Sequence, residues 1–176
     1  RRSQDFADEG SLILDGGPWT MVANLPYNVG TPLLLDALTG SPEITRFVVM
    51  LQREAVDRLT SGPGSKAYGL PSVVVGLHAA ARAAFRVPST VFLPRPEVES
   101  AVAVLDRIEP DRLAPQAIRL AGAGFGQRRK MLRRSLAGVL ADPAGTLEAA
   151  GIDPTRRAED LAPGDYLLIA EVAVAS

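Results

Sequence analysis

The stretch Met21-Val22-Ala23-Asn24-Leu25-Pro26-Tyr27, with Thr31-Pro32 shortly after it, decides the fold of this chain. It joins a short apolar run to a polar tetrapeptide and then to a helix start, as in a strand–loop–helix unit. In open α/β sheets, ligands bind at the edge where such strands end. The sequence therefore predicts a buried strand over residues 20–23 that opens into a pocket at residues 24–27.

The chemistry of this tetrapeptide suits a planar base that carries an exocyclic amine. Pro26 has a fixed φ and no N–H, and it drives Leu25 into an extended conformation, so we expect the Leu25 carbonyl to face a cleft. The side-chain oxygen of Asn24 adds a second acceptor, and two acceptors hold both hydrogens of an adenine amine. Tyr27 offers a stacking face worth about 1–3 kcal/mol. The alternative is a strand-ending turn, because asparagine and proline are common in turns.

Four stretches, in chain order, carry a resemblance to a known family. The first is Asn24-Leu25-Pro26-Tyr27-Asn28 with Thr31-Pro32. The others are Gln52–Val56 with the loop Pro63–Gly69, the loop Val91–Ser100, and Phe125–Leu132 with Arg157–Leu161. Together they resemble the ribosomal RNA adenine N6,N6-dimethyltransferases of the kasugamycin-sensitivity class. Ordered matches are far more specific than a single motif, and they make the turn a minor alternative.

The resemblance implies a fold and an activity. The fold is α/β, the C-terminal half of a Rossmann-like S-adenosylmethionine-dependent methyltransferase sheet followed by a small all-helical domain. We therefore expect a partial catalytic domain over residues 1–109 and a small helical RNA-binding domain over residues 110–176. The implied reaction uses S-adenosyl-L-methionine to dimethylate the N6 amine of two adjacent adenosines near the 3′ end of small-subunit (16S) ribosomal RNA, in ribosome biogenesis. The implied partner is that RNA or the 30S precursor.

The resemblance also implies a set of site residues. The catalytic residues would be Asn24, Leu25, Pro26, Tyr27 and Phe92, and Asn24 would also touch the cofactor. Phe92 lies in a loop with three prolines, which makes the loop stiff enough to present a second ring against Tyr27. The alternative role for Phe92 is an anchor that plugs this loop onto the core.

The family carries a cofactor-binding half upstream of the tetrapeptide, with a Gly-rich turn between a strand and a helix. No such turn precedes Asn24, because Gly16-Gly17-Pro18 is only a turn signal. Residue 1 is Arg and not Met. We therefore expect this sequence to be the C-terminal portion of a longer enzyme, with most of the cofactor site outside it.

The composition narrows the classes of function. A hydrophobic fraction of 47% indicates a packed globule. No apolar run approaches the roughly 20 residues of a membrane span, and no signal peptide is visible. Zero cysteines exclude disulfides, and a single histidine argues against a His-rich metal site or a Ser-His-Asp triad. We expect a structural His78, no metal, no membrane partner, a monomer and a cytoplasmic location.

The net charge of −1 hides a strong asymmetry. Residues 111–141 hold seven arginines and lysines against one acid, whereas residues 142–176 hold seven acids against two arginines. We expect a helix over residues 127–140 that buries its leucines and presents a basic face to RNA phosphates. The expected RNA-binding residues are Arg128, Arg129, Lys130, Arg133 and Arg134. The alternative is a solvated face paired with acids of the last 35 residues.

The remaining pattern predicts short elements. We expect a helix that begins with Thr31 as its N-cap and ends at Gly40. Residues 71–87 are ambiguous, and their valines and the resemblance favour two strand segments with a break. The other expected elements are a parallel strand over 47–51 covered on both faces, a helix over 54–59, a loop over 62–69, an antiparallel strand over 100–106, and helices after residue 110.

Three other functions stay open. A large-subunit ribosomal RNA adenine methyltransferase of the antibiotic-resistance type has a similar pocket, although the segment 127–132 resembles it less. A non-catalytic RNA-binding or ribosome-assembly protein would keep the same fold. A DNA adenine methyltransferase usually has two prolines before the aromatic residue of the comparable motif, whereas this chain has Pro26 alone.

Overall fold

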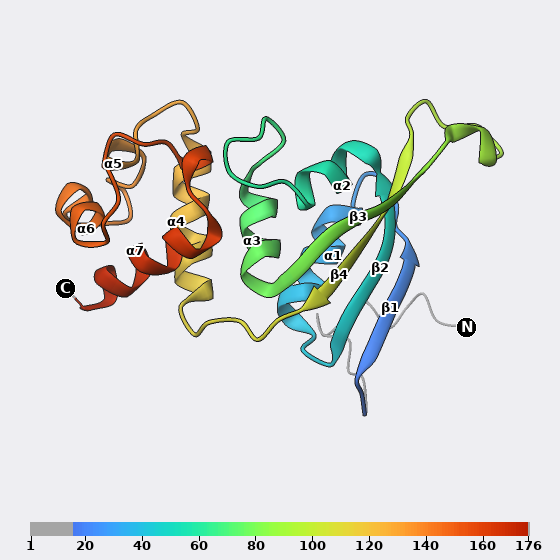
Figure 1. Cartoon of the computed structure of the whole chain (residues 1–176), viewed down its shortest axis with the longest axis horizontal. Coiled ribbons are helices and arrows are strands. Elements are labelled where there is room, and N and C mark those ends of the chain that lie inside the picture. The colour runs from blue at the N-terminus through green and yellow to red at the C-terminus, as the bar shows by residue number, and fades with distance from the viewer. Residues whose placement is uncertain (1–15, 176) are drawn as a thin grey trace.

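The computed structural model describes residues 16–175, and the first part of the expected catalytic domain, residues 1–15, lies outside them. A four-stranded sheet organises residues 19–107 (Figure 1). Its strands are β1 (Trp19–Asn24), β2 (Ile44–Gln52), β3 (Ala79–Val87) and β4 (Ser100–Arg107), in the spatial order β1-β2-β4-β3. The β1 and β2 strands are parallel, whereas β4 runs antiparallel to both of its neighbours.

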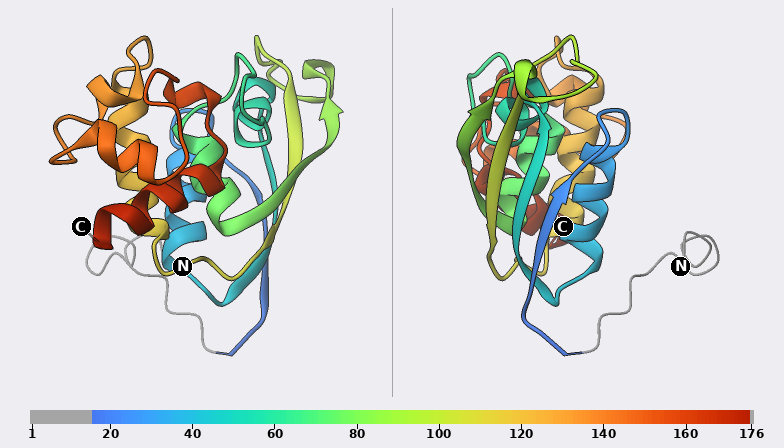
Figure 2. Two further views of the ribbon diagram at one scale, coloured as in Figure 1. Left: turned by 60° about the vertical axis from the view of Figure 1, so that its left-hand side comes forward. Right: turned by 90° about the vertical axis from the view of Figure 1, so that its right-hand side faces the viewer.

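Helices α1 (Gly30–Gly40), α2 (Arg53–Leu59) and α3 (Leu70–His78) lie on one face of this sheet (Figure 2). Residues of β2 alternate accordingly: Phe47, Val49 and Leu51 are buried against the helices, whereas Val48 and Met50 are half-buried on the other face. No helix of the described region covers that other face. The expectation of a strand covered on both faces is therefore wrong for residues 16–175.

The strand expected over residues 20–23 is present as β1, but it is not buried there. Val22 is 75% exposed, because it pairs with Val48 and lies on the face of the sheet that no helix of the described region covers. The next helix also begins earlier than predicted. Val29 and not Thr31 is the N-cap of α1, although Gly40 is its last residue as expected.

The close approach at Gly30 explains this early helix start. Its N–H donates to the Pro26 carbonyl over 2.7 Å. A Cβ atom added at Gly30 would lie 2.5 Å from Leu51 Cδ2 and 2.9 Å from Leu25 Cβ. Only glycine fits between these two side chains, so the first turn of α1 is pressed against the end of β1 and the core of β2.

The prediction for residues 71–87 is wrong in its first half, because residues 70–78 form α3 and not a strand. Pro71 stands at the helix start, where its lack of an N–H costs nothing. Burial on two sides overrides the strand preference of the valines: Val75 packs in the sheet core, whereas Val73 and Leu77 pack in the helical core. The alanine-rich second half forms β3, as predicted.

Four helices and a 3₁₀ turn make up the C-terminal part of the described chain. They are α4 (Ala114–Gly126), α5 (Leu132–Ser135), α6 (Pro143–Ala149), α7 (Pro163–Ala175) and η2 (Ala158–Asp160). Their core also contains Tyr68 and Leu77, from the sequence before residue 109. The domain boundary expected at residues 109–110 stays a prediction. None of the helices between residues 16 and 175 has the length and apolar character needed to cross a membrane.

The helix expected over residues 127–140 is wrong. The chain turns between α4 and α5, and α5 has only four residues. The backbone N–H of Leu132 donates to the Arg156 carbonyl over 2.8 Å, and not to a preceding turn. Leu132 and Leu136 are buried as predicted, but a contact distant in sequence directs the backbone.

Two buried tyrosines form hydrogen bonds that stabilise the helical part of the chain. The Tyr68 hydroxyl donates to the Leu161 carbonyl over 2.8 Å, and the Tyr166 hydroxyl donates to the Ala158 carbonyl over 2.9 Å. Burial, and secondarily the nearby charge of Asp165, raises the pKa of Tyr68 to about 12. Burial also raises the pKa of Tyr166 well above its usual range, so both hydroxyls stay protonated donors at neutral pH.

Candidate active site and nucleic-acid interface

A cavity of about 330 Å³ lies at the C-terminal end of β1. The residues that line it come from the last residue of β1, the segment after it, and the loop between β3 and β4: Asn24, Leu25, Pro26, Tyr27, Phe92, Pro94 and Pro96. The structure thus brings all five predicted catalytic residues to one cavity, although Phe92 is distant from the others in sequence. Their individual roles stay a prediction.

The end of β1 leaves two hydrogen-bond acceptors available. The Leu25 N–H donates to the Met50 carbonyl over 3.0 Å, and the Leu25 side chain is buried. The Leu25 carbonyl, however, accepts no hydrogen bond from any residue between 16 and 175. The exposed Asn24 side chain also makes no hydrogen bond within this described region. Both oxygens keep unused lone pairs, so these two adjacent acceptors can bind a ligand amine that carries two hydrogens.

The two aromatic side chains that line the cavity, Tyr27 and Phe92, are held in place by different contacts. The Tyr27 ring is 38% exposed, and its hydroxyl lies 2.6 Å from the Ser100 hydroxyl. Phe92 is half-buried and follows a 3₁₀ turn, η1 (Ser89–Val91). The Ser89 hydroxyl in that turn accepts a hydrogen bond from Arg95 Nε over 3.0 Å. The proline-rich loop is therefore braced by its own contacts.

Ser100 is a site residue that the sequence did not reveal. It is fully buried at the first position of β4. It ends the stretch Val91–Ser100 that supports the family resemblance, but that stretch contains no indication that its hydroxyl meets Tyr27. Only the fold brings these two side chains together.

The predicted basic residues lie on the turn between α4 and α5 and, for Arg133 and Arg134, on α5 itself; together they are called the basic turn. Arg128 differs from the rest: its Nε donates to Glu159 over 2.7 Å, and its Nη2 donates to the Lys66 carbonyl over 3.3 Å. The alternative of a face paired with C-terminal acids thus holds for Arg128. The others have no ion pair with any residue that the structure describes, and they are exposed: Arg129, Lys130, Arg133 and Arg134.

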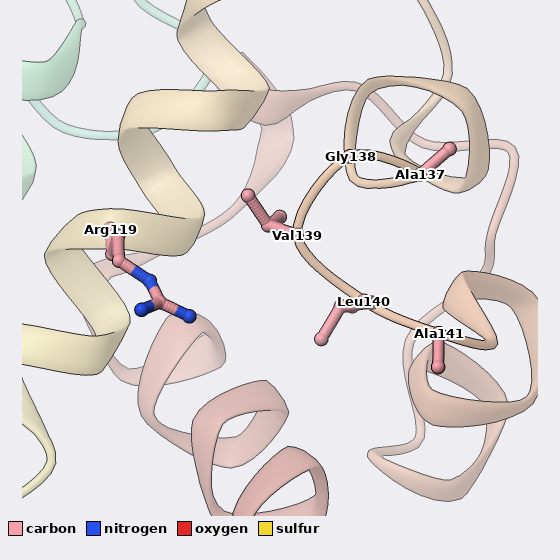
Figure 3. Close-up of a pocket in the computed structure, with 6 residues that line it drawn as sticks. All are labelled: Arg119, Ala137, Gly138, Val139, Leu140 and Ala141. Carbon is pink, nitrogen blue, oxygen red and sulfur yellow. The ribbon is translucent and has the colours of Figure 1, made fainter.

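A second, shallow cavity of about 580 Å³ lies in the helical part (Figure 3). Arg119 projects from α4 toward the loop of residues 137–141, which forms the opposite wall. The sequence did not predict this cavity. Arg119 adds one more exposed positive charge to the helical part.

His78 lies apart from both cavities. It is buried, and its Nδ1 lies 2.9 Å from the Val74 carbonyl. This arrangement agrees with the structural role expected for it. Residues 16–175 contain no group of three or more histidine, cysteine or acidic side chains arranged to hold a metal ion.

Comparison with known proteins identifies the family. The family model described as ribosomal RNA adenine dimethylase matches residues 11–174. The chain belongs to this family. It is 44% identical over 175 residues to the ribosomal RNA small subunit methyltransferase A of Phenylobacterium zucineum (strain HLK1), covering 96% of this chain and 59% of that relative. It is 43% identical over 188 residues to the enzyme of the same name from Acidothermus cellulolyticus (strain ATCC 43068 / DSM 8971 / 11B), covering 97% of this chain and 64% of the relative.

Solved structures confirm the predicted fold class of this family member. A dimethyladenosine transferase from Plasmodium falciparum superposes with a TM-score of 0.78 at 20% identity, over 90% of this chain and 67% of that one. The 23S rRNA methyltransferase ErmE superposes with a TM-score of 0.69 at 20% identity, over 96% of this chain and 70% of that one. The chain spans less than two thirds of the length of the two curated relatives.

Proposed function

We propose that this chain is the substrate-binding part of an S-adenosyl-L-methionine-dependent ribosomal RNA adenine N6-methyltransferase. Its substrate would be two adjacent adenosines near the 3′ end of small-subunit ribosomal RNA, each dimethylated, within a 30S precursor. The observation that carries the proposal is the cavity where two acceptors and two aromatic rings meet at the end of β1. Membership of the dimethylase family supports it.

In this function, the chain contributes to catalysis by holding the adenine base and its N6 amine in a fixed orientation. The Asn24 side-chain oxygen and the Leu25 carbonyl each accept one hydrogen of the adenine N6 amine. This grip turns the nitrogen lone pair out of conjugation with the ring, while Tyr27 and Phe92 hold the base by stacking. The alkylated amine is acidic and releases its proton to water, so no general base is required.

The residues that the structure describes could form only one edge of a cofactor site. S-Adenosyl-L-methionine, when bound, supplies an electrophilic methyl group. Asn24 is the one described residue that we assign to its contact, because its side chain is exposed at the strand end and makes no hydrogen bond among residues 16–175. Its amide N–H groups can then donate to the cofactor while its oxygen accepts from the substrate.

The basic turn would supply affinity for the RNA. Arg129, Lys130, Arg133 and Arg134 are exposed, and they would pair with phosphates, as cations do in sequence-independent binding. Arg128 would contribute charge while it anchors the turn. Residues 110–176 would then act as the RNA-binding domain of a monomeric, cytoplasmic enzyme.

The test measures methyl transfer from labelled S-adenosyl-L-methionine to unmethylated 30S precursors. It uses the 176-residue chain alone and the same chain joined to the part of the Phenylobacterium relative that it does not match, called the joined protein below. We expect the joined protein to produce N6,N6-dimethyladenosine, mapped by mass spectrometry to adjacent positions near the 3′ end.

Other outcomes contradict the proposal and favour one of the alternatives. Methylation of large-subunit RNA in place of the 30S precursor favours the antibiotic-resistance type of enzyme. Methylation of DNA favours a DNA enzyme. RNA binding by the joined protein without any transfer, while the intact Phenylobacterium relative is active in the same assay, favours a non-catalytic RNA-binding protein.

A further inference from the structure

The contact between Tyr27 and Ser100 joins the two walls of the base-binding cavity. The two hydroxyl oxygens are 2.6 Å apart, although the residues are 73 positions apart in sequence. Ser100 is the first residue of β4 and directly follows the loop that begins after β3 and contains Phe92. One segment of chain therefore presents the second ring and also holds the first.

Ser100 is a rigid support for this contact. It pairs with Gln52 of β2 and with Val87 of β3, so β4 is fixed at this residue from both sides. The preceding residue, Glu99, is fixed as well: its carbonyl accepts from the Arg53 N–H over 2.9 Å, and its carboxylate accepts from Arg53 Nη1 over 3.0 Å. The Ser100 side chain is fully buried, so bulk water does not compete for its hydroxyl.

The geometry of a tyrosine decides what this hydrogen bond restrains. The hydroxyl lies on the axis about which the ring flips, so the bond leaves rotation about Cβ–Cγ free. It instead restrains the swing of the whole ring about Cα–Cβ. Tyr27 needs this restraint, because it lies in the segment between β1 and α1 and its ring is only partly covered.

We infer that Ser100 is a positioning residue, whose hydroxyl holds the Tyr27 ring at the separation from Phe92 that an adenine requires. The inference rests on the proposed function, because it assigns the cavity to a base. Ser100 itself touches no substrate and acts only through Tyr27. The Tyr27 hydroxyl then serves alignment and takes no part in proton transfer.

The first experiment observes Tyr27 directly, in the 176-residue chain with carbon-13 in its tyrosine rings. The chain has three tyrosines, and Tyr68 and Tyr166 are buried in the helical core. The signal that disappears in Tyr27→Phe belongs to Tyr27. We expect Ser100→Ala to narrow this signal and move it toward that of tyrosine in a short peptide, while the two buried tyrosines stay unchanged.

Ser135→Ala is the matched control for this experiment. Ser135 is also a buried serine, 2% exposed, but it lies in α5 and its hydroxyl faces the Leu132 carbonyl. It should leave the Tyr27 signal at the wild-type position. An unchanged Tyr27 signal in Ser100→Ala would show that the two hydroxyls do not hold each other in solution.

The second experiment measures methyl transfer by the joined protein. We expect Ser100→Ala to lower kcat about tenfold, the scale of one lost hydrogen bond, while KM for the RNA stays unchanged. Tyr27→Phe keeps the ring and removes only the hydroxyl, so it should match Ser100→Ala, and the double variant should fall no further.

The outcomes separate this inference from the function on which it rests. If the wild-type joined protein transfers no methyl group, the proposed function and the positioning role fail together. If it is active and Ser100→Ala keeps the wild-type kcat, the positioning role alone is overturned. Multiplied losses in the double variant would also overturn it, because they would mean that the two hydroxyls act independently.

Discussion

The cavity at the end of β1 and the basic turn after α4 would engage the same RNA by opposite means. The cavity uses uncharged groups on rigid supports, since the Leu25 N–H is bonded to β2 and Tyr27 is bonded to Ser100. The basic turn uses exposed charges, of which Arg128 is anchored to Glu159. Neutral groups act through geometry, whereas charges act over distance and are screened by salt. Substitutions in the cavity should therefore change rate, and substitutions on the turn should change affinity.

The largest effect is expected for Asn24→Ala in the joined protein. The substitution removes one of the two acceptors that orient the amine, and loss of one such positioned group costs roughly 10² or more in rate. Affinity for the RNA should stay at the wild-type value, because the basic turn supplies it. Single-turnover methyl transfer and a filter-binding assay measure the two quantities. Wild-type turnover by Asn24→Ala would refute its role.

Gly30→Ala tests whether the cavity depends on its backbone support. The added Cβ would lie 2.5 Å from Leu51 Cδ2 and 2.9 Å from Leu25 Cβ, so one of these must move. Overpacking of this kind lowers the free energy of unfolding by about 1–3 kcal/mol. Gly40→Ala, at the other end of α1, meets nothing within 4 Å and is the matched control. Urea denaturation of the chain measures both, and equal stability of the two variants would contradict this account of Gly30.

Removing two charges from the basic turn, as Arg129→Ala with Lys130→Ala, should weaken RNA binding about tenfold at low salt. The slope of the logarithm of the binding constant against the logarithm of salt concentration should become shallower by about 1.4–1.8, which is two phosphate contacts. The control is Arg46→Ala with Arg58→Ala, which removes the same charge from ion pairs with Asp106 and Glu54. If both double variants change binding equally, net charge and not the turn is responsible.

The same contrast separates what the sequence could predict from what it could not. The cavity was predictable because a short local motif contains the end of the strand, the proline and the ring together. The meeting of Phe92 with Tyr27 at one cavity needed the family resemblance, since nothing local connects residues so distant in sequence. Ser100 was missed for the same reason.

Two wrong element predictions have one physical cause. The valines of α3 favour a strand locally, but this segment is buried between the sheet core and the helical core. The leucines after residue 131 have helical spacing, but α4 already ends at Gly126, and the Leu132 N–H then donates to the distant Arg156 carbonyl. In both cases contacts distant in sequence decide the backbone, and periodicity does not report such contacts.

Arg128→Lys gives the smallest expected effect and tests the division between anchor and phosphate contact. Lysine keeps the positive charge, but it lacks the planar guanidinium with which Arg128 reaches both Glu159 and the Lys66 carbonyl. The stability of the chain should fall by about 0.5–1 kcal/mol, because this pair is only partly exposed. The salt dependence of RNA binding should not change, because the number of charges is the same. Unchanged stability of Arg128→Lys would contradict the anchoring role of these two contacts.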